Sequence, residues 1–198
     1  MRGDTHILGG VTLATGVTLI SGIYMPQNIE QSKVSFLVFG SYLLGAGIGA
    51  VLPDIDKKGS TVSNRAKIVS FISRVLFTHR GFTHSLLAML ILCAVLLPIG
   101  YYSPNQNFLP FMVGIIVGFD SHLLLDSLNP TGIMLFYPFN IHISFARINT
   151  GGLIEKLFKI LLFICLIFFL KMVLERVITL EQIKRYFFDI PIVNKIMS

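Results

Sequence analysis

Four long stretches without a charged side chain constrain the fold of this chain more than any other feature. They are residues 7–25, 34–52, 85–102 and 108–119, the last continuing through Asp120 and His122 to Leu125. A helix needs about 20 mostly apolar residues to cross the hydrocarbon core of a bilayer. Each of the four stretches is therefore predicted to form a transmembrane helix.

A fifth apolar segment follows at residues 157–174, with Lys159 and Lys171 near its ends. The two lysines are about 18 Å apart along a helix, so their ammonium groups can reach opposite interfaces of the membrane. This segment is predicted either to span or to lie tilted and shallow in the interface. The expected fold is all-α: an integral membrane bundle of four to five transmembrane helices.

The last twenty residues have a different character from the rest of the chain. Residues 179–198 read as an amphipathic helix interrupted at Pro191 and resting on the membrane surface. The predicted organisation is one membrane-embedded domain, residues 1–178, followed by this tail.

The composition excludes several other classes of protein. Only 13% of the 198 residues are charged and 54% are apolar, whereas a soluble domain is about 25% charged. A soluble globule and a disordered chain are both excluded on this ground. The two cysteines, Cys93 and Cys165, lie in apolar runs and do not indicate a disulfide scaffold. The net charge of +6 is assigned to lipid headgroups and not to nucleic acid, because most basic residues flank apolar stretches.

The basic residues also predict the orientation in the membrane. Six of them fall between positions 53 and 84: Lys57, Lys58, Arg65, Lys67, Arg74 and Arg80. Loops rich in lysine and arginine stay in the cytoplasm. A multi-pass protein of the cell (inner) membrane is expected, with residues 53–84 and 127–158 on the cytoplasmic side.

Small residues recur within two of the apolar stretches. Gly45, Gly47 and Gly49 lie in one, and Gly114 and Gly118 lie four residues apart in another. Glycines allow the backbones of membrane helices to approach closely. Close helix packing is therefore predicted at both places.

Histidine and aspartate side chains collect at one end of the predicted helices. Asp4 and His6 precede the first stretch, Asp54 and Asp56 follow the second, His79 and His84 precede the third, and Asp120, His122 and Asp126 lie toward the end of the fourth. Because successive helices alternate in direction, all of these residues fall on the cytoplasmic side of the membrane. Ionisable groups at such positions are costly and usually functional. Histidine and aspartate without cysteine suit zinc, manganese or iron, and nine candidate ligands suggest two or more ions.

The local spacings support metal binding unevenly. His122 and Asp126 are four residues apart and share a helix face, whereas Asp120 lies on a different face. Asp54 and Asp56 follow a proline, and both could face one ion only if the chain turns there. Further along, Thr83 or Ser85 is expected to cap the third helix.

The motifs formed by these residues resemble the YdjM family of membrane-bound, metal-dependent hydrolases, which in some bacteria are under LexA control. The resemblance rests on Thr5-His6, Leu52-Pro53-Asp54-Ile55-Asp56, His79-Arg80-Gly81-Phe82-Thr83-His84-Ser85 and Ser121-His122-Leu123-Leu124-Leu125-Asp126, and covers roughly residues 1–155. The family is distantly similar to zinc-dependent phospholipase C and the S1/P1 nucleases. This similarity implies an all-helical fold, a multinuclear zinc site and phosphoester chemistry.

The resemblance also implies a set of ligands. They would be His6, Asp54, Asp56, His79, His84, His122 and Asp126. Glu155 could supply a further acidic ligand, or it could be a helix-start carboxylate favoured by the helix dipole.

The leading hypothesis is hydrolysis of a phosphoester in a lipid or lipid-linked substrate by metal-activated water. Asp56 or Asp120 would accept the proton from the water. Arg80 would stabilise negative charge on the phosphate and Arg147 would bind it, although both arginines could instead be cytoplasmic anchors. Two alternatives remain: a cation-binding protein or transporter without hydrolytic activity, and a protein whose metal only ties helices together.

Overall fold

The computed structural model describes residues 1–23, 29–56 and 81–177. Within these ranges it contains five α-helices and two short 3-10 helices: α1 (Gly3–Ser21), α2 (Ile29–Gly49), η1 (Pro53–Asp56), η2 (Phe82–His84), α5 (Leu86–Tyr101), α6 (Phe108–Asp126) and α7 (Leu153–Val177). The described ranges hold no β-strand, only an isolated antiparallel bridge between Ile133 and Ile143. The predicted all-α class is confirmed. His79, Arg80 and the predicted tail, residues 179–198, lie outside the described residues.

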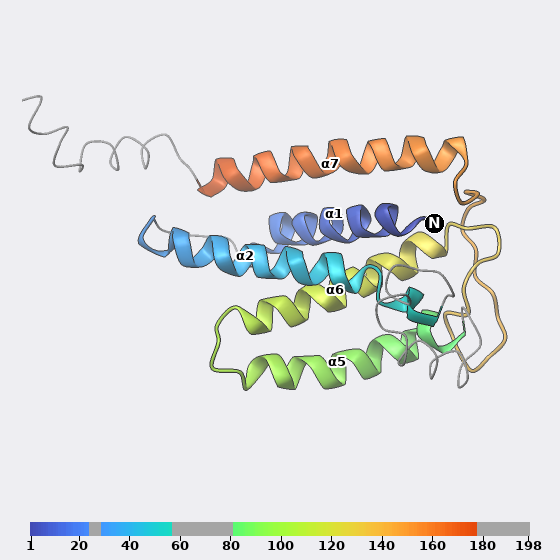
Figure 1. Ribbon diagram of the computed structural model, residues 1–198, viewed down its shortest axis with the longest axis horizontal. Coiled ribbons are helices and arrows are strands. Elements are labelled where there is room, and N and C mark those ends of the chain that lie inside the picture. Colours follow the sequence, from blue (N-terminus) through green and yellow to red (C-terminus); the bar gives the residue numbers. More distant parts are fainter. Residues whose placement is uncertain (24–28, 57–80, 178–198) are drawn as a thin grey trace, which may run out of the picture.

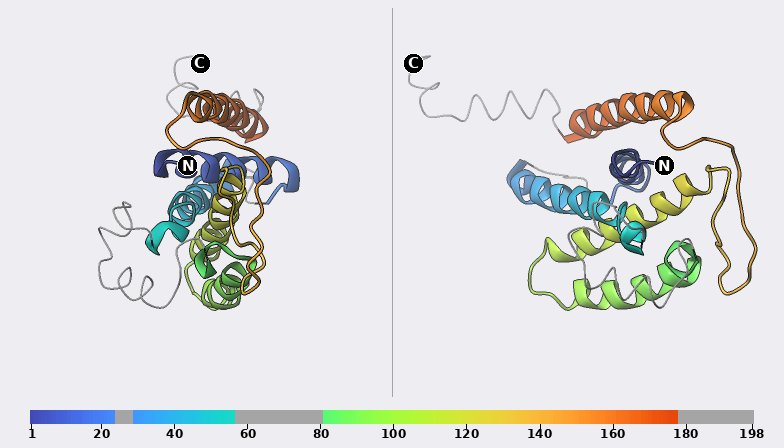
Figure 2. Two further views of the ribbon diagram at one scale, coloured as in Figure 1. Left: turned by 90° about the vertical axis from the view of Figure 1, so that its right-hand side faces the viewer. Right: turned by 45° about the vertical axis from the view of Figure 1, so that its right-hand side comes forward.

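The helices form a bundle organised around α1 and α6. Helix α1 lies between α7 on one side and α2 and α6 on the other, and α5 packs against α6 (Figure 1). Helix α1 crosses the bundle obliquely, so that it is seen nearly end-on in the view where the other helices run across the picture (Figure 2). At the right-hand end of Figure 1, α1, α5 and α7 begin and α2 and α6 end. This is the alternation that the sequence predicted, and it gathers the polar ends of the helices.

Helices α2 and α6 are in backbone contact through glycines. A Cβ atom added to Gly45 or Gly49 of α2, or to Gly114 or Gly118 of α6, would overlap a backbone carbonyl oxygen of the opposite helix. The predicted close packing is therefore present. Gly47 does not take part, since a Cβ there would meet only side chains of α1, at 3.8 and 3.9 Å. The close contact brings the end of α2 against the last turns of α6.

The start of α5 is fixed by a serine cap. Ser85 is the N-cap residue, and its hydroxyl accepts a hydrogen bond from the amide of Ala88 at 3.2 Å while donating to the carbonyl of Phe82. Of the two predicted caps, Ser85 is the one used. The cap holds η2, and with it His84, immediately before the first turn of α5.

Among the residues that the structure describes, two helices are long and apolar enough to cross a membrane, α6 and residues 153–176 of α7. Residues 36–49 and 86–101 form shorter apolar helices. Of the most apolar 18 residues of α6, 56% are buried within the protein, compared with 6% for the corresponding stretch of α7. Helix α6 is thus the centre of the bundle, whereas α7 contacts α1 and presents most of its apolar surface outward. Cys93 and Cys165 are both free thiols.

Candidate metal centre

Five buried histidine and aspartate side chains meet where the helices end. His6 comes from α1, Asp54 from η1, His84 from η2, and His122 and Asp126 from α6. The three histidines are completely buried, and Asp126 and Asp54 are only 2% and 7% exposed. We refer to these five residues as the His/Asp cluster. Charged and polar side chains are rarely buried together unless they are paired or bind a metal.

The spacing within the His/Asp cluster suits the ligand shell of a cation. The Nε2 atoms of His84 and His122 are 3.2 Å apart, and each lies 3.7 Å from Oδ2 of Asp126. Nε2 of His6 is 3.2 Å from Oδ1 of Asp126, and Nε2 of His84 is 4.0 Å from Oδ1 of Asp54. Ligand atoms 2.0–2.2 Å from a tetrahedral zinc ion are about 3.3–3.6 Å from one another. The observed separations of 3.2–4.0 Å bracket that value.

Two of the histidines are oriented by hydrogen bonds to their other ring nitrogen. Nδ1 of His122 lies 2.7 Å from the carbonyl oxygen of Ala50, so Nδ1 carries the proton and Nε2 keeps its lone pair. Nδ1 of His84 lies 3.0 Å from Oγ1 of Thr83. Metal-binding histidines commonly use such outer partners, which fix the ring and its tautomer. Ala50 is available because the glycine contacts press the end of α2 against α6.

His6 provides the test of whether the residues fit a metal. Its ring stacks on that of His122, with the centroids 3.8 Å apart and the planes 15° apart. The side chain is completely buried, yet neither ring nitrogen makes a hydrogen bond within the described part of the chain. A buried polar group without a partner costs about 1–3 kcal/mol. A cation bound at Nε2 would remove that cost, so the donor set fits a divalent metal ion.

Asp126 is the carboxylate at the centre of the cluster. Its Oδ1 atom accepts hydrogen bonds from Nδ2 of Asn129 at 2.7 Å and from the α-amino group of Met1 at 2.9 Å. Its Oδ2 atom faces His84 and His122. Two groups of three residues could each hold a metal ion: His6, His122 and Asp126, and Asp54, His84 and His122. The two oxygens of Asp126 thus face different histidines, Oδ1 facing His6 and Oδ2 facing His84 and His122.

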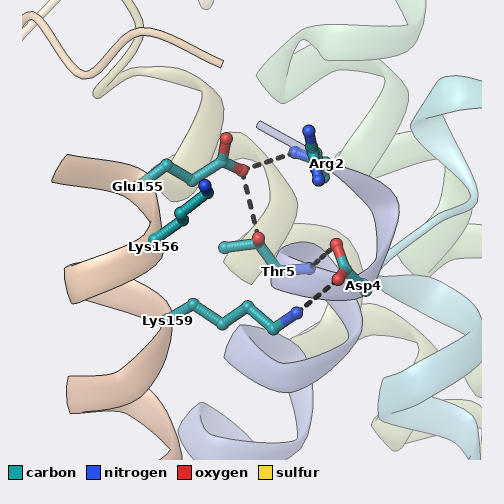
Figure 3. Close-up of a pocket in the computed structure, with 6 residues that line it drawn as sticks. All are labelled: Arg2, Asp4, Thr5, Glu155, Lys156 and Lys159. Carbon is teal, nitrogen blue, oxygen red and sulfur yellow. Dashed lines mark hydrogen bonds and ion pairs between the residues drawn. The ribbon is translucent and has the colours of Figure 1, made fainter. Parts of the chain in front are cut away.

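Glu155 is buried but is not brought to the His/Asp cluster. Its Oε1 atom accepts hydrogen bonds from the backbone amide of Arg2 at 2.6 Å and from the Thr5 hydroxyl at 3.0 Å (Figure 3). Its Oε2 atom accepts a hydrogen bond from the backbone amide of Gly151. These contacts match the second of the two roles considered for Glu155, a carboxylate at the start of a helix. They also join the start of α7 to the first turn of α1.

The remaining predicted residues lie away from the cluster or outside the described ranges. Asp120 lines an apolar cavity of about 340 Å³ between α5, α6 and the loop that follows α6, on a different face of α6 from His122. Arg147 is exposed on that loop. The backbone of Asp56 lies in η1, but its side chain is outside the described part of the structure, as are His79 and Arg80.

Sequence reasoning missed the groups that support the cluster. The carbonyl of Ala50 carries no signature in the sequence, because every residue has one. Asn129 was available as a signal, since it follows Asp126 by three residues at the end of a helix. An asparagine at that spacing can reach back to the carboxylate, as it does here.

Comparison with known proteins places the chain in a family. Residues 1–181 match the family model described as YdjM inner membrane protein. The chain belongs to the YdjM family. The resemblance noted in the motifs is thereby confirmed, and the chain is assigned to a family of membrane proteins. The more distant similarity to phospholipase C stays a prediction.

Curated proteins similar to this chain come from three bacteria. "Uncharacterized protein YvsG" of Bacillus subtilis (strain 168) is 32% identical over 160 residues, covering 79% of this chain and 86% of the relative. "Inner membrane protein YdjM" of Escherichia coli (strain K12) is 40% identical over 91 residues, which is 44% of each chain. The protein of the same name from Shigella flexneri matches equally. This chain thus spans less than half the length of the two YdjM proteins. No solved structure matches it.

Proposed function

We propose that this YdjM-family protein is a membrane-bound, metal-dependent hydrolase that cleaves a phosphoester of a lipid or lipid-linked substrate. The observation that carries the proposal is the convergence of three buried imidazoles on Asp126, with both nitrogens of His6 lacking a hydrogen bond within the described residues. Asparagine, threonine and a backbone carbonyl already hold the rest of the cluster.

The metal that suits these residues best is zinc, with manganese and iron as substitutes, and two ions are proposed. His84, His122 and Asp54 would hold one, and His6 would hold the other, with Asp126 between them. His79 is proposed to complete the set, which leaves Asp56 free of the metal. When bound, zinc lowers the pKa of coordinated water toward 7 and so supplies hydroxide at neutral pH.

The protein's own residues would position the substrate and move the proton. Asp56 is the preferred proton acceptor, because it lies in the same short helix as Asp54, whereas Asp120 lies nearly half a turn around α6 from His122. Arg80, close in sequence to His84, is proposed to stabilise the phosphate through paired N–H donors. Arg147 is proposed to bind the substrate from the loop after α6.

The membrane topology proposed for this activity is multi-pass. Helices α1, α2, α5 and α6 would cross the inner membrane together with α7, leaving the His/Asp cluster at the cytoplasmic face. A lipid could then present its phosphate to the cluster while its acyl chains stay in the bilayer. The position of the cluster at helix ends favours an enzyme over a transporter, whose binding site belongs near the bilayer midplane.

The experiment combines metal analysis with activity on defined lipids. The full chain is purified in detergent, its zinc, manganese and iron are measured, and hydrolysis of phospholipids and lipid phosphates is followed with and without a chelator. We expect bound metal, activity that a chelator abolishes, and recovery when zinc is restored. Activity insensitive to the chelator would refute the mechanism. Bound metal without hydrolysis would favour the cation-binding alternative.

A further inference from the structure

A second polar site lies beside the His/Asp cluster, where the first turns of α1 and α7 meet. It is a pocket of about 40 Å³ lined by Arg2, Asp4, Thr5, Glu155, Lys156 and Lys159 (Figure 3). None of these residues belongs to the His/Asp cluster. A cavity of about 10–15 Å³ holds one water molecule, so this pocket has room for about three atoms of that size, enough for the two non-bridging oxygens of a phosphate diester.

The two carboxylates of this pocket are already paired. Glu155 accepts hydrogen bonds from Arg2, Thr5 and Gly151. Asp4 forms an ion pair with the Lys159 ammonium group, which reaches across from α7 to α1 (Figure 3). Neither carboxylate therefore requires a further cation.

Two cations of the pocket have no such partner. The side chains of Arg2 and Lys156 are exposed and form no ion pair with the described residues. The Arg2 guanidinium lies over Gly151, where a Cβ atom would come within 3.3 Å of its Nη2 atom, and the φ angle of 78° at Gly151 also favours glycine. With three basic and two acidic side chains, the lining carries a net charge of +1. The pocket is thus set up for an anion with a single negative charge.

The surroundings indicate where such an anion comes from. Directly after the pocket, α7 presents a surface of large apolar side chains that are each more than half exposed: Ile154, Leu157, Ile160, Leu161 and Ile164. In a membrane protein such a surface faces acyl chains. The pocket therefore lies at the end of a lipid-facing helix, at the level of the headgroups. Basic pockets between membrane helices bind the head groups of anionic lipids.

We propose that Arg2 and Lys156 bind the phosphodiester of an anionic phospholipid in the groove between α1 and α7. The phosphodiester carries one negative charge and balances the lining, and the acyl chains would lie along the exposed face of α7. Helices α1 and α7 both begin at the pocket, and their N-terminal dipoles add to the attraction for an anion. This site is independent of the proposed hydrolysis.

The test measures lipid binding to the full chain in detergent by native mass spectrometry. The probes are phosphatidylglycerol, phosphatidylcholine and the soluble anion glycerol 3-phosphate. The variant Arg2→Gln/Lys156→Gln is compared with Lys171→Gln, which removes a lysine from the same helix at its other end. We expect the double variant to bind phosphatidylglycerol about 25-fold more weakly, from about fivefold per cation, and Lys171→Gln to bind as the parent does.

Three results would overturn this proposal. The double variant could bind phosphatidylglycerol as strongly as Lys171→Gln, phosphatidylcholine could bind as well as phosphatidylglycerol, or glycerol 3-phosphate could bind as tightly as the lipid. Correct folding is checked by far-UV circular dichroism. If the double variant does not fold, the single variants replace it. Lys156→Gln is expected to bind phosphatidylglycerol about fivefold more weakly than the parent, whereas Lys156→Arg should bind it as the parent does. Equal binding of phosphatidylglycerol by these two variants would also overturn the proposal.

Discussion

His6 and Glu155 are both buried polar side chains at the same end of the bundle, yet their surroundings differ completely. Glu155 accepts hydrogen bonds from three donors, on Arg2, Thr5 and Gly151, so its oxygens are satisfied within the protein. His6 has no hydrogen bond at either nitrogen among the described residues, although both atoms are buried. A buried group whose hydrogen bonds are complete holds the fold together, whereas one that lacks them is a candidate to bind a ligand. The contrast separates a structural carboxylate from a histidine that could bind a metal.

The strongest test of this contrast removes a histidine whose outer partner is already in place. Zinc binds structural sites with about 10–16 kcal/mol, so loss of one of four ligands removes about 2.5–4 kcal/mol. His122→Ala is therefore expected to weaken zinc binding about a hundredfold or more, measured by competition with a chelating dye. His142→Ala is the control, because His142 is exposed on the loop after α6. Equal zinc affinity in both variants would contradict the assignment.

Loss of Glu155 is expected to lower the stability of the fold by an amount that does not depend on metal. Glu155→Leu leaves three donors without their acceptor, and each unsatisfied buried group costs about 1–3 kcal/mol. Allowing for donors that gain water, we expect a loss of about 2–3 kcal/mol, seen as a lower midpoint of thermal unfolding in detergent. The shift should be the same with zinc and with a chelator.

The control for Glu155 is Glu175→Leu, in the same helix. Glu175 is exposed and forms only a surface ion pair with Lys171 at 3.6 Å, so its loss should change stability by less than about 1 kcal/mol. A Glu155→Leu protein that unfolds at the parent temperature but has lost its zinc would show instead that Glu155 acts as a ligand.

The contact between α2 and α6 links the fold to the site and gives a third expectation. A Cβ at Gly118 would overlap the carbonyl oxygen of Ala46, four residues before the carbonyl that orients His122. Gly118→Ala is expected to cost about 1–3 kcal/mol, as overpacking does, and to lower zinc affinity because Ala50 moves. Gly40→Ala is the matched control, since nothing lies within 4 Å of its added Cβ. Thermal unfolding and zinc titration of the two variants separate these effects.

Much of this arrangement follows from the sequence, and the reason is topological. Uncharged stretches that alternate in direction must bring His6, Asp54, His84 and Asp126 to one end, and these residues do meet. The four-residue spacing of His122 and Asp126 likewise places them on one face, and the two-residue spacing places Asp120 on another. These inferences need only the length and period of a helix.

The contacts of Glu155 could not be inferred in the same way. Its partners Arg2 and Thr5 lie about 150 positions earlier, and two of its three donors are backbone amides, which every residue except proline possesses. The glycines show the same limit. Gly45, Gly47 and Gly49 are equivalent in the sequence, and only the crossing of α2 with α6 selects Gly45 and Gly49.

The smallest expected effect is the most discriminating, because its sign depends on the metal. His6→Phe keeps a ring that can stack on His122 but removes both ring nitrogens, neither of which makes a hydrogen bond to the described residues. In the presence of a chelator we expect stability to rise by about 1 kcal/mol, or about 2–4 °C in the unfolding midpoint for a chain of this size. With zinc the order should reverse, since the parent gains stability from the ion and the variant gains less. If His6→Phe lowers the midpoint in chelator as Glu155→Leu does, the two buried groups have the same role. The distinction between a completed hydrogen-bond set and a missing ligand would then fail for this protein.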